Sequence, residues 1–206
     1  AKMLVGAIGG ACATLPHETY ADWSRQWLTA LEHARLSDAK NLLAVAPEIC
    51  LAHARLGLTE SLQRWIEQFT DPSDPGALDP VQAALAGFQL AAQNLDAAEA
   101  HLFAIASPSL RDPVLADLIT ACAASNPDRA SAHLLLIESP TTRTQLAKKL
   151  ASQPEFSTSE TALHRLVVAM GDSPEALGEL IASLPKTSTS SHLIQKISTS
   201  LQLDRQ

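Results

Sequence analysis

Two residues with the chemistry to bind a metal ion, Cys50 and His53, lie about one helical turn apart in the sequence. On a helix this spacing puts both side chains on one face, but a zinc site needs further ligands, and the sequence has no second pair of this kind. HETY at 17–20 begins like a zinc-protease motif, although Ala21 stands where that motif needs its second histidine. We therefore predict no metal site and no zinc-based catalysis.

The segment DPSDPGALDPVQ at 71–82 partly matches a calcium-binding loop. Asp71 suits the first ligand position, and Gly76 suits the sharp turn at the sixth. Pro75, however, occupies a ligand position, and Gln82 replaces the bidentate glutamate that ends such a loop. The segment is therefore predicted to be a turn-rich connection.

Two further histidines, His101 and His133, each stand directly before a leucine. They could form a pH-sensitive or ligand-contacting row, or they could fill half-buried structural positions. Arg111 and Arg143 are separated by the same interval as the two histidines, and we expect them to satisfy exposed carbonyl groups at corners between helices. Because a phosphate-binding loop and a nucleophile elbow are both missing, no catalytic, cofactor-binding or metal-ligating residue is predicted.

The elements that would position these residues are predicted to be helices. Alanine and leucine contribute 35 and 32 of the 206 residues, whereas aromatic residues make up 4%. Alanine and leucine favour helices, while strands favour β-branched and aromatic residues. We predict an all-α fold of about 12 to 13 short helices in one domain over residues 1–206. Apolar spacing places them near 3–13, 17–35, 38–46, 48–57, 59–70, 80–93, 95–106, 113–124, 127–138, 141–152, 159–170, 173–184 and 190–202.

Four helix starts are indicated by a capping residue directly before a proline. These pairs are Asp79-Pro80, Asp112-Pro113, Asn126-Pro127 and Ser173-Pro174. The longest interruption, at 70–80, is predicted to be a hinge or an exposed loop. We expect 186–206 to form a polar connection followed by a C-terminal capping helix.

An internal echo links the phrases IASPSLRD at 105–112 and IESPTTRT at 137–144. Each phrase begins at the end of an apolar stripe spaced i, i+4 and i+7, a helical face that a neighbour must cover. The clearest stripes are Ala98-Leu102-Ile105 and Ala130-Leu134-Ile137, and weaker copies are Leu62-Ile66-Phe69, Ala39-Leu43-Ala46 and Ala176-Leu180-Ser183. We interpret the echo as a duplicated joint between helical hairpins.

The stretch LAGFQLAAQNLDAAEAHLFAIASP at 85–108 resembles the tetratricopeptide repeat, whose two antiparallel helices carry a large-small pair on the first and alanine on the second. The resemblance implies an α-solenoid of antiparallel helical hairpins, although the stripes are less evenly spaced than in that family. The alternative is an irregular α-helical bundle. The resemblance also implies that a partner peptide lies along the first helices, and the residues that it assigns to partner binding are Ala83, Gly87, Leu90, Leu115, Ile119 and Cys122.

Charge and cysteine content restrict the partners and the compartment. The net charge is −7 and basic residues form no long cluster, which disfavours nucleic-acid binding. Three widely spaced cysteines favour buried thiols over a disulfide framework. Residues 3–13 are predicted to form a packed helix of a cytoplasmic protein, without a membrane span. The alternative is an exported protein in which 3–13 ends a targeting segment, and the opening Ala-Lys suggests that upstream residues are missing.

These observations favour a non-enzymatic module that binds another protein or peptide, or acts as a scaffold, without a cofactor. Helical arrays leave extended surfaces on which other proteins bind. The alternative is a small-ligand-binding or enzymatic helical bundle, which would need polar side chains converging on one cavity. A nucleic-acid-binding helical repeat is a third hypothesis, opposed by the acidic charge.

Overall fold

The computed structural model describes residue 26 and residues 46–70, 74–171, 174–184, 191–192 and 194–195. Over these residues the chain forms nine α-helices and one short 3-10 helix, and no strand. The prediction of an all-α fold is therefore confirmed for the described part of the chain. The helices predicted before residue 46 and after residue 186 lie almost entirely outside the described residues.

Contacts within the chain define two compact units, Ala1–Arg111 and Asp112–Gln206. The prediction of one domain over 1–206 did not include this division, which falls between two consecutive residues of a helix. The predicted loop at 70–80 lies inside the first unit, where residues 75–78 form turns, residues 79–80 begin α6 and residues 71–73 are outside the described residues.

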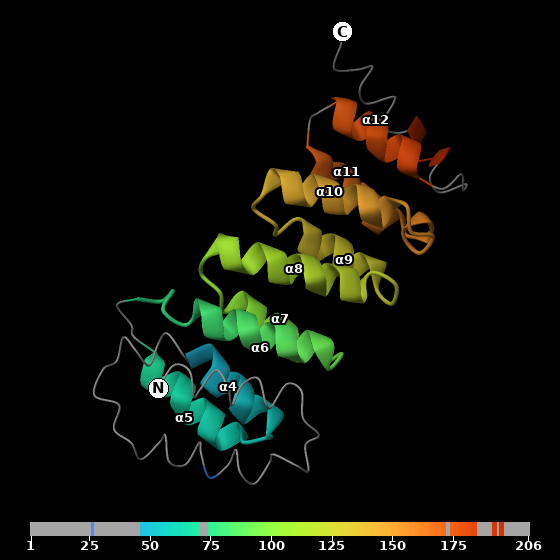
Figure 1. Ribbon diagram of the computed structural model, residues 1–206. Helices are drawn as coiled ribbons and strands as arrows, with labels where there is room; N and C mark the ends of the chain where they lie inside the picture. The colour runs from blue at the N-terminus through green and yellow to red at the C-terminus, as the bar shows by residue number, and fades with distance from the viewer. Residues whose placement is uncertain are drawn as a thin grey trace. The chain divides into compact units, whose positions relative to one another are not determined.

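The first unit contains four described helices: α4 (Ala46–Arg55), α5 (Thr59–Phe69), α6 (Asp79–Ala91) and α7 (Leu95–Phe103). Helix α4 packs against α5 and α6, and α6 packs against α7 (Figure 1). Between α4 and α5 the chain reverses at Gly57, whose φ of +68° favours a residue without a side chain. Buried residues of this core include Ile49, Cys50, Trp65 and Leu85.

The second unit contains most of α8 (Pro108–Cys122), then α9 (Pro127–Leu134), α10 (Pro140–Ala151), α11 (Glu160–Met170) and α12 (Pro174–Ser183). Helix α11 packs against α9, α10 and α12, and α10 also packs against α12 (Figure 1). Phe156, in the 3-10 helix Phe156–Thr158 that precedes α11, is fully buried and fills the corner between α10 and α11.

The predicted helix starts agree with the structure at Asn126, whose side chain accepts a hydrogen bond of 2.9 Å from the backbone N–H of Arg129. The start predicted at Asp112-Pro113 is wrong, because α8 already begins at Pro108. The backbone carbonyl of Ser107 accepts from the N–H groups of Leu110 and Arg111, so the first turn closes before Pro113 is reached. Helix α6 begins at Asp79 itself, and no side chain caps it.

Two predicted apolar stripes are core faces. The stripe Ala98-Leu102-Ile105 is at most 2% exposed, and Ala130-Leu134-Ile137 is 0% exposed. A further stripe at Ala162-Leu166-Ala169, which follows the second at the same interval, is also at most 2% exposed, although the sequence pattern was not recognised there. In the weaker copy Ala176-Leu180-Ser183, only Leu180 is buried.

Candidate functional site

Two aspartates make the same pair of hydrogen bonds at two places in the chain. The carboxylate of Asp79 accepts from the backbone N–H groups of Ala106, at 2.9 Å, and Ser107, at 2.6 Å. The carboxylate of Asp112 accepts from the N–H groups of Glu138, at 3.3 Å, and Ser139, at 2.9 Å. In each case Oδ1 takes the first N–H group and Oδ2 the second. We call each arrangement a carboxylate clasp.

The clasps explain the echo in the sequence. Ser107 and Ser139 each precede the proline that starts α8 or α10, where backbone N–H groups have no partner within the helix. A carboxylate satisfies such groups with charge-assisted hydrogen bonds and opposes the positive end of the helix dipole. Asp79 and Asp112 are only 2% and 6% exposed, so these bonds also compensate for removing each carboxylate from water.

Arg143 contacts the joint that Asp112 also binds and links it to the end of α11. Its Nε donates to the backbone carbonyl of Ala169 at 3.2 Å, and one of its terminal nitrogens donates to the carbonyl of Ile137 at 3.1 Å. Both carbonyls lie at the end of an apolar stripe. The structural role predicted for Arg143 is therefore confirmed.

The two histidines at matching places are both held within the fold. Nδ1 of His101 lies 2.8 Å from Oε1 of Gln82, which ties α7 to α6. Burial lowers the pKa of His101 below its ordinary value, which favours a neutral ring at neutral pH. His133 is 7% exposed. Of the two alternatives, these positions match half-buried structural histidines better than a ligand-contacting row.

Cys50 and His53 pack in the core of the first unit. Nδ1 of His53 lies 2.7 Å from the backbone carbonyl of Ile49, and its ring centroid lies 6.1 Å from that of Trp65. Burial raises the pKa of the Cys50 thiol to about 12, so this thiol stays protonated. Among the described residues, no group of three or more histidines, cysteines and carboxylates is placed to hold a metal ion.

The residues assigned to partner binding divide into two sets. In α6, Gly87 is exposed, while Ala83 and Leu90 are half-buried. The three residues in α8 are 0% exposed, and they are Leu115, Ile119 and Cys122. A partner cannot reach side chains without accessible surface, so the assignment in α8 is corrected.

The error in α8 comes from the register. The residues were carried over with the interval between the apolar stripes, whereas the interval from Asp79 to Asp112, which the clasps relate, is one residue longer. With this longer shift, Gly87 corresponds to Thr120, which is exposed, and Ala83 corresponds to Ala116, which is half-buried. A shift of one residue in a helix rotates a side chain by about 100°, which is enough to move it from the surface into the core.

Sequence reasoning missed a group of exposed apolar side chains at the ends of the helices that carry the stripes. In the second unit these are Leu135 at 37%, Leu136 at 45% and Val168 at 52% exposure. Leu136 and Val168 each directly precede the last residue of a stripe. Leu136 lies in the turn that follows α9, and Val168 lies near the end of α11, which packs against α9. We call Leu135, Leu136 and Val168 the apolar patch.

A signal for the apolar patch was present in the sequence. The run LLLI at 134–137 has four consecutive apolar residues, more than one face of so short a segment can bury. Leu134, the last residue of α9, and Ile137, in the segment that follows α9, are 0% exposed, while the two residues between them are exposed. Phe103, at 52% exposure in the first unit, follows the buried Leu102 in the same way.

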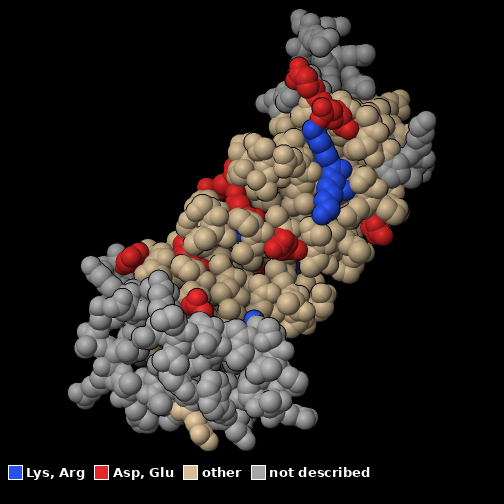
Figure 2. All heavy atoms as spheres, viewed as in Figure 1, with Lys and Arg blue, Asp and Glu red and all other residues tan. Residues whose placement is uncertain are grey.

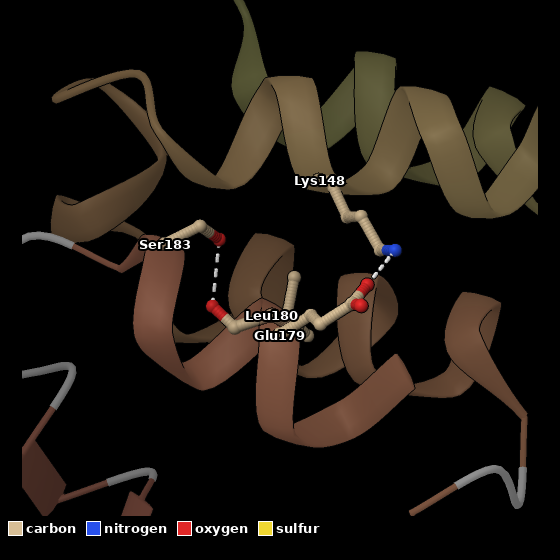
Figure 3. A network of polar contacts seen from close by, with 4 residues as sticks. All are labelled: Lys148, Glu179, Leu180 and Ser183. Carbon is tan, nitrogen blue, oxygen red and sulfur yellow. Dashed lines mark hydrogen bonds and ion pairs between the residues drawn. The ribbon is translucent and has the colours of Figure 1, made fainter. Parts of the chain in front are cut away.

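Charged side chains are sparse on the face of the second unit seen in Figure 2. Its basic side chains gather over α10, which contributes Lys148 and Lys149, beside acidic side chains of α12. Lys148 forms an ion pair with Glu179 that joins these two helices, as Figure 3 shows. Both partners are exposed, so the pair contributes little to stability.

No helix in the described part of the chain is long and apolar enough to cross a membrane. Comparisons with protein-family models, with curated proteins and with solved structures find no match.

Proposed function

We propose that this chain is an array of antiparallel helical hairpins that binds another protein, without catalytic activity of its own. The observation that carries the proposal is the apolar patch, whose three side chains are between 37% and 52% exposed. Two of them directly follow α9 and the third lies in α11, and these two helices pack together. Single exposed apolar residues are common, whereas a group of large ones on neighbouring elements is typical of interaction sites.

The hairpin array is supported by features that recur at a nearly constant spacing. Three buried stripes begin at Ala98, Ala130 and Ala162, and the two intervals between them are equal. A residue of a type that favours helix capping, followed by a proline, recurs at nearly the same interval, in the pairs Asp74-Pro75, Ser107-Pro108, Ser139-Pro140 and Ser173-Pro174. These intervals are close to the period of about 34 residues that is typical of helix-pair repeats, which leave extended surfaces for partners.

The partner we propose is a protein segment with an apolar helical face. The exposed side chains of the patch are aliphatic, and an amphipathic helix buries such residues by placing its own apolar face over them. This location differs from the first-helix face that the resemblance implies, where Ala83, Gly87 and Leu90 offer less apolar side-chain surface. The patch is therefore the better contact surface on the described residues.

The proposal is tested by affinity capture with quantitative mass spectrometry, using the wild-type chain and two triple variants as baits. The patch variant carries Leu135→Ser, Leu136→Ser and Val168→Ser. The control variant changes three exposed residues in α10, in α8 and just after α8 to serine, and they are Gln145, Thr120 and Ala124. Circular dichroism shows whether both variants keep the helical content of the wild type.

We expect a partner that is enriched by the wild type and the control and reduced at least about tenfold by the patch variant, a loss of about 1.4 kcal/mol in binding. Equal enrichment by all three baits would remove the patch from the interface. A wild-type bait that enriches no protein over an unrelated helical protein would contradict the interaction function itself.

A further inference from the structure

We propose that Asp79 and Asp112 each fix the conformation of the connection that leads into the next helical hairpin. Each carboxylate acts on its own connection, and we call the two carboxylates joint locks. The inference concerns the fold of the chain and stands whether or not the chain binds a partner. It assigns a conformational role to two buried carboxylates at corresponding places in the sequence.

Each clasp joins residues that are far apart in the sequence. Asp79 binds amides 27 and 28 residues further along the chain, and Asp112 binds amides 26 and 27 residues further along. Hydrogen bonds within a helix join residues four apart and cannot span such a distance. Each clasp therefore connects a helix to the segment that follows the next helix: α6 to the segment after α7, and α8 to the segment after α9.

The chemistry of each joint matches a carboxylate. The amides of Ala106 and Ser107 precede α8, and those of Glu138 and Ser139 precede α10, so none of them has an acceptor within those helices. A carboxylate offers two acceptor oxygens and no donor, which matches two adjacent N–H groups. An amide side chain has one oxygen and an NH₂ group, so Asp→Asn keeps the shape but loses one of the two bonds.

The next joint has no carboxylate at the corresponding position. The position that follows Arg143, as Asp112 follows Arg111, is Thr144, which has no carboxylate. There Arg143 donates to the carbonyl of Ala169 instead, near the end of α11. In the described part of the chain, a carboxylate therefore binds the joint before α8 and the joint before α10. The joint after α11 has no such carboxylate at the corresponding position.

The test is amide hydrogen exchange, measured residue by residue by NMR, on the full chain and the single variants Asp79→Asn, Asp112→Asn and Asp117→Asn. Asp117 lies in α8, five residues after Asp112, but its side chain is exposed, so this variant is a matched control for the loss of one negative charge. Hydrogen bonds to charged groups are among the strongest in proteins, so losing one should speed exchange about tenfold or more, and tenfold corresponds to about 1.4 kcal/mol.

We expect Asp79→Asn to speed exchange at Ala106 and Ser107 about tenfold or more while leaving Glu138 and Ser139 unchanged. Asp112→Asn should do the reverse, and Asp117→Asn should change neither joint. Equal acceleration at both joints in each variant would show a general loss of stability and overturn the proposal, as would unchanged exchange at the joint of the altered aspartate.

A measurement on the wild-type chain keeps the proposal testable even where a variant fails to fold. A hydrogen bond transmits a scalar coupling between the donor nitrogen and the acceptor carbon. We expect this coupling between the Ser107 amide nitrogen and Cγ of Asp79, and between the Ser139 amide nitrogen and Cγ of Asp112. If neither coupling is found while couplings within helices are observed, the clasps are absent in solution and the proposal fails.

Discussion

Two leucines separated by a single residue in the run LLLI should have very different effects on stability. Leu134 is 0% exposed and lies in a buried stripe, while Leu136 is 45% exposed in the apolar patch. Leu→Ala removes three carbons, and at about 0.8 kcal/mol per buried carbon the transfer cost at Leu134 is about 2.4 kcal/mol. The cavity that remains raises this cost to about 3 kcal/mol. At Leu136 the side chain is already in partial contact with water, so we expect a loss below about 1 kcal/mol.

The assay is urea-induced unfolding, monitored by circular dichroism at several protein concentrations. With a slope of about 2 kcal/mol per molar urea, Leu134→Ala should lower the unfolding midpoint by about 1.5 M and Leu136→Ala by less than about 0.5 M. Equal losses in the two variants would refute the assignment of the stripe to the core. A loss of stability confined to Leu136→Ala would contradict both the burial of Leu134 and the exposure of Leu136.

Three further predictions concern individual contacts. Asn126→Ala should lower the free energy of unfolding by about 1 kcal/mol, because it removes the helix cap that accepts from Arg129, whereas Asn126→Asp should largely preserve it; urea unfolding measures both. Burial raises the pKa of the Cys50 thiol to about 12, so iodoacetamide at about pH 8 should label Cys50 only after denaturation, as mass spectrometry of tryptic peptides would show. Burial lowers the pKa of His101 from its ordinary 6.5, so the unfolded chain takes up a proton first as the pH falls, and the free energy of unfolding should decrease below pH 6.5. His101→Gln should flatten this pH dependence in urea titrations, and an unchanged slope would contradict it.

Local signals determine most of the helices, which is why the sequence predicted them well. Asn126 before Pro127 marks the start of α9 because a cap and a proline act through the nearest backbone groups alone. The predicted start of α8 was wrong because the same pattern at Asp112-Pro113 competes with Ser107-Pro108, five residues earlier. A proline near the start of a helix costs one internal hydrogen bond, and the earlier joint, held by Asp79, outweighs that cost.

The clasps themselves could not be predicted from spacing alone. Asp79 and Asp112 each stand before a proline, a pattern that indicates a cap for the helix at that proline, and nothing local indicates that the carboxylate binds amides in a distant connecting segment. The prediction that three residues of α8 are accessible failed for a related reason. The interval from Asp79 to Asp112 is one residue longer than the interval between the stripes that begin at Ala98 and Ala130. Only the pairing of distant segments shows that difference.

The joint locks also address a weakness of the apolar stripes. The stripes in α7, α9 and α11 have nearly the same composition, so apolar packing alone distinguishes poorly between correct and shifted pairings of helices. A buried carboxylate has directional requirements that a leucine lacks. A shifted pairing within either unit would leave Asp79 or Asp112 without its donors while it remained away from water, at a cost of several kcal/mol. We infer that the stripes provide apolar packing with little selectivity, while the directional hydrogen bonds of the two aspartates favour the observed joints over shifted ones.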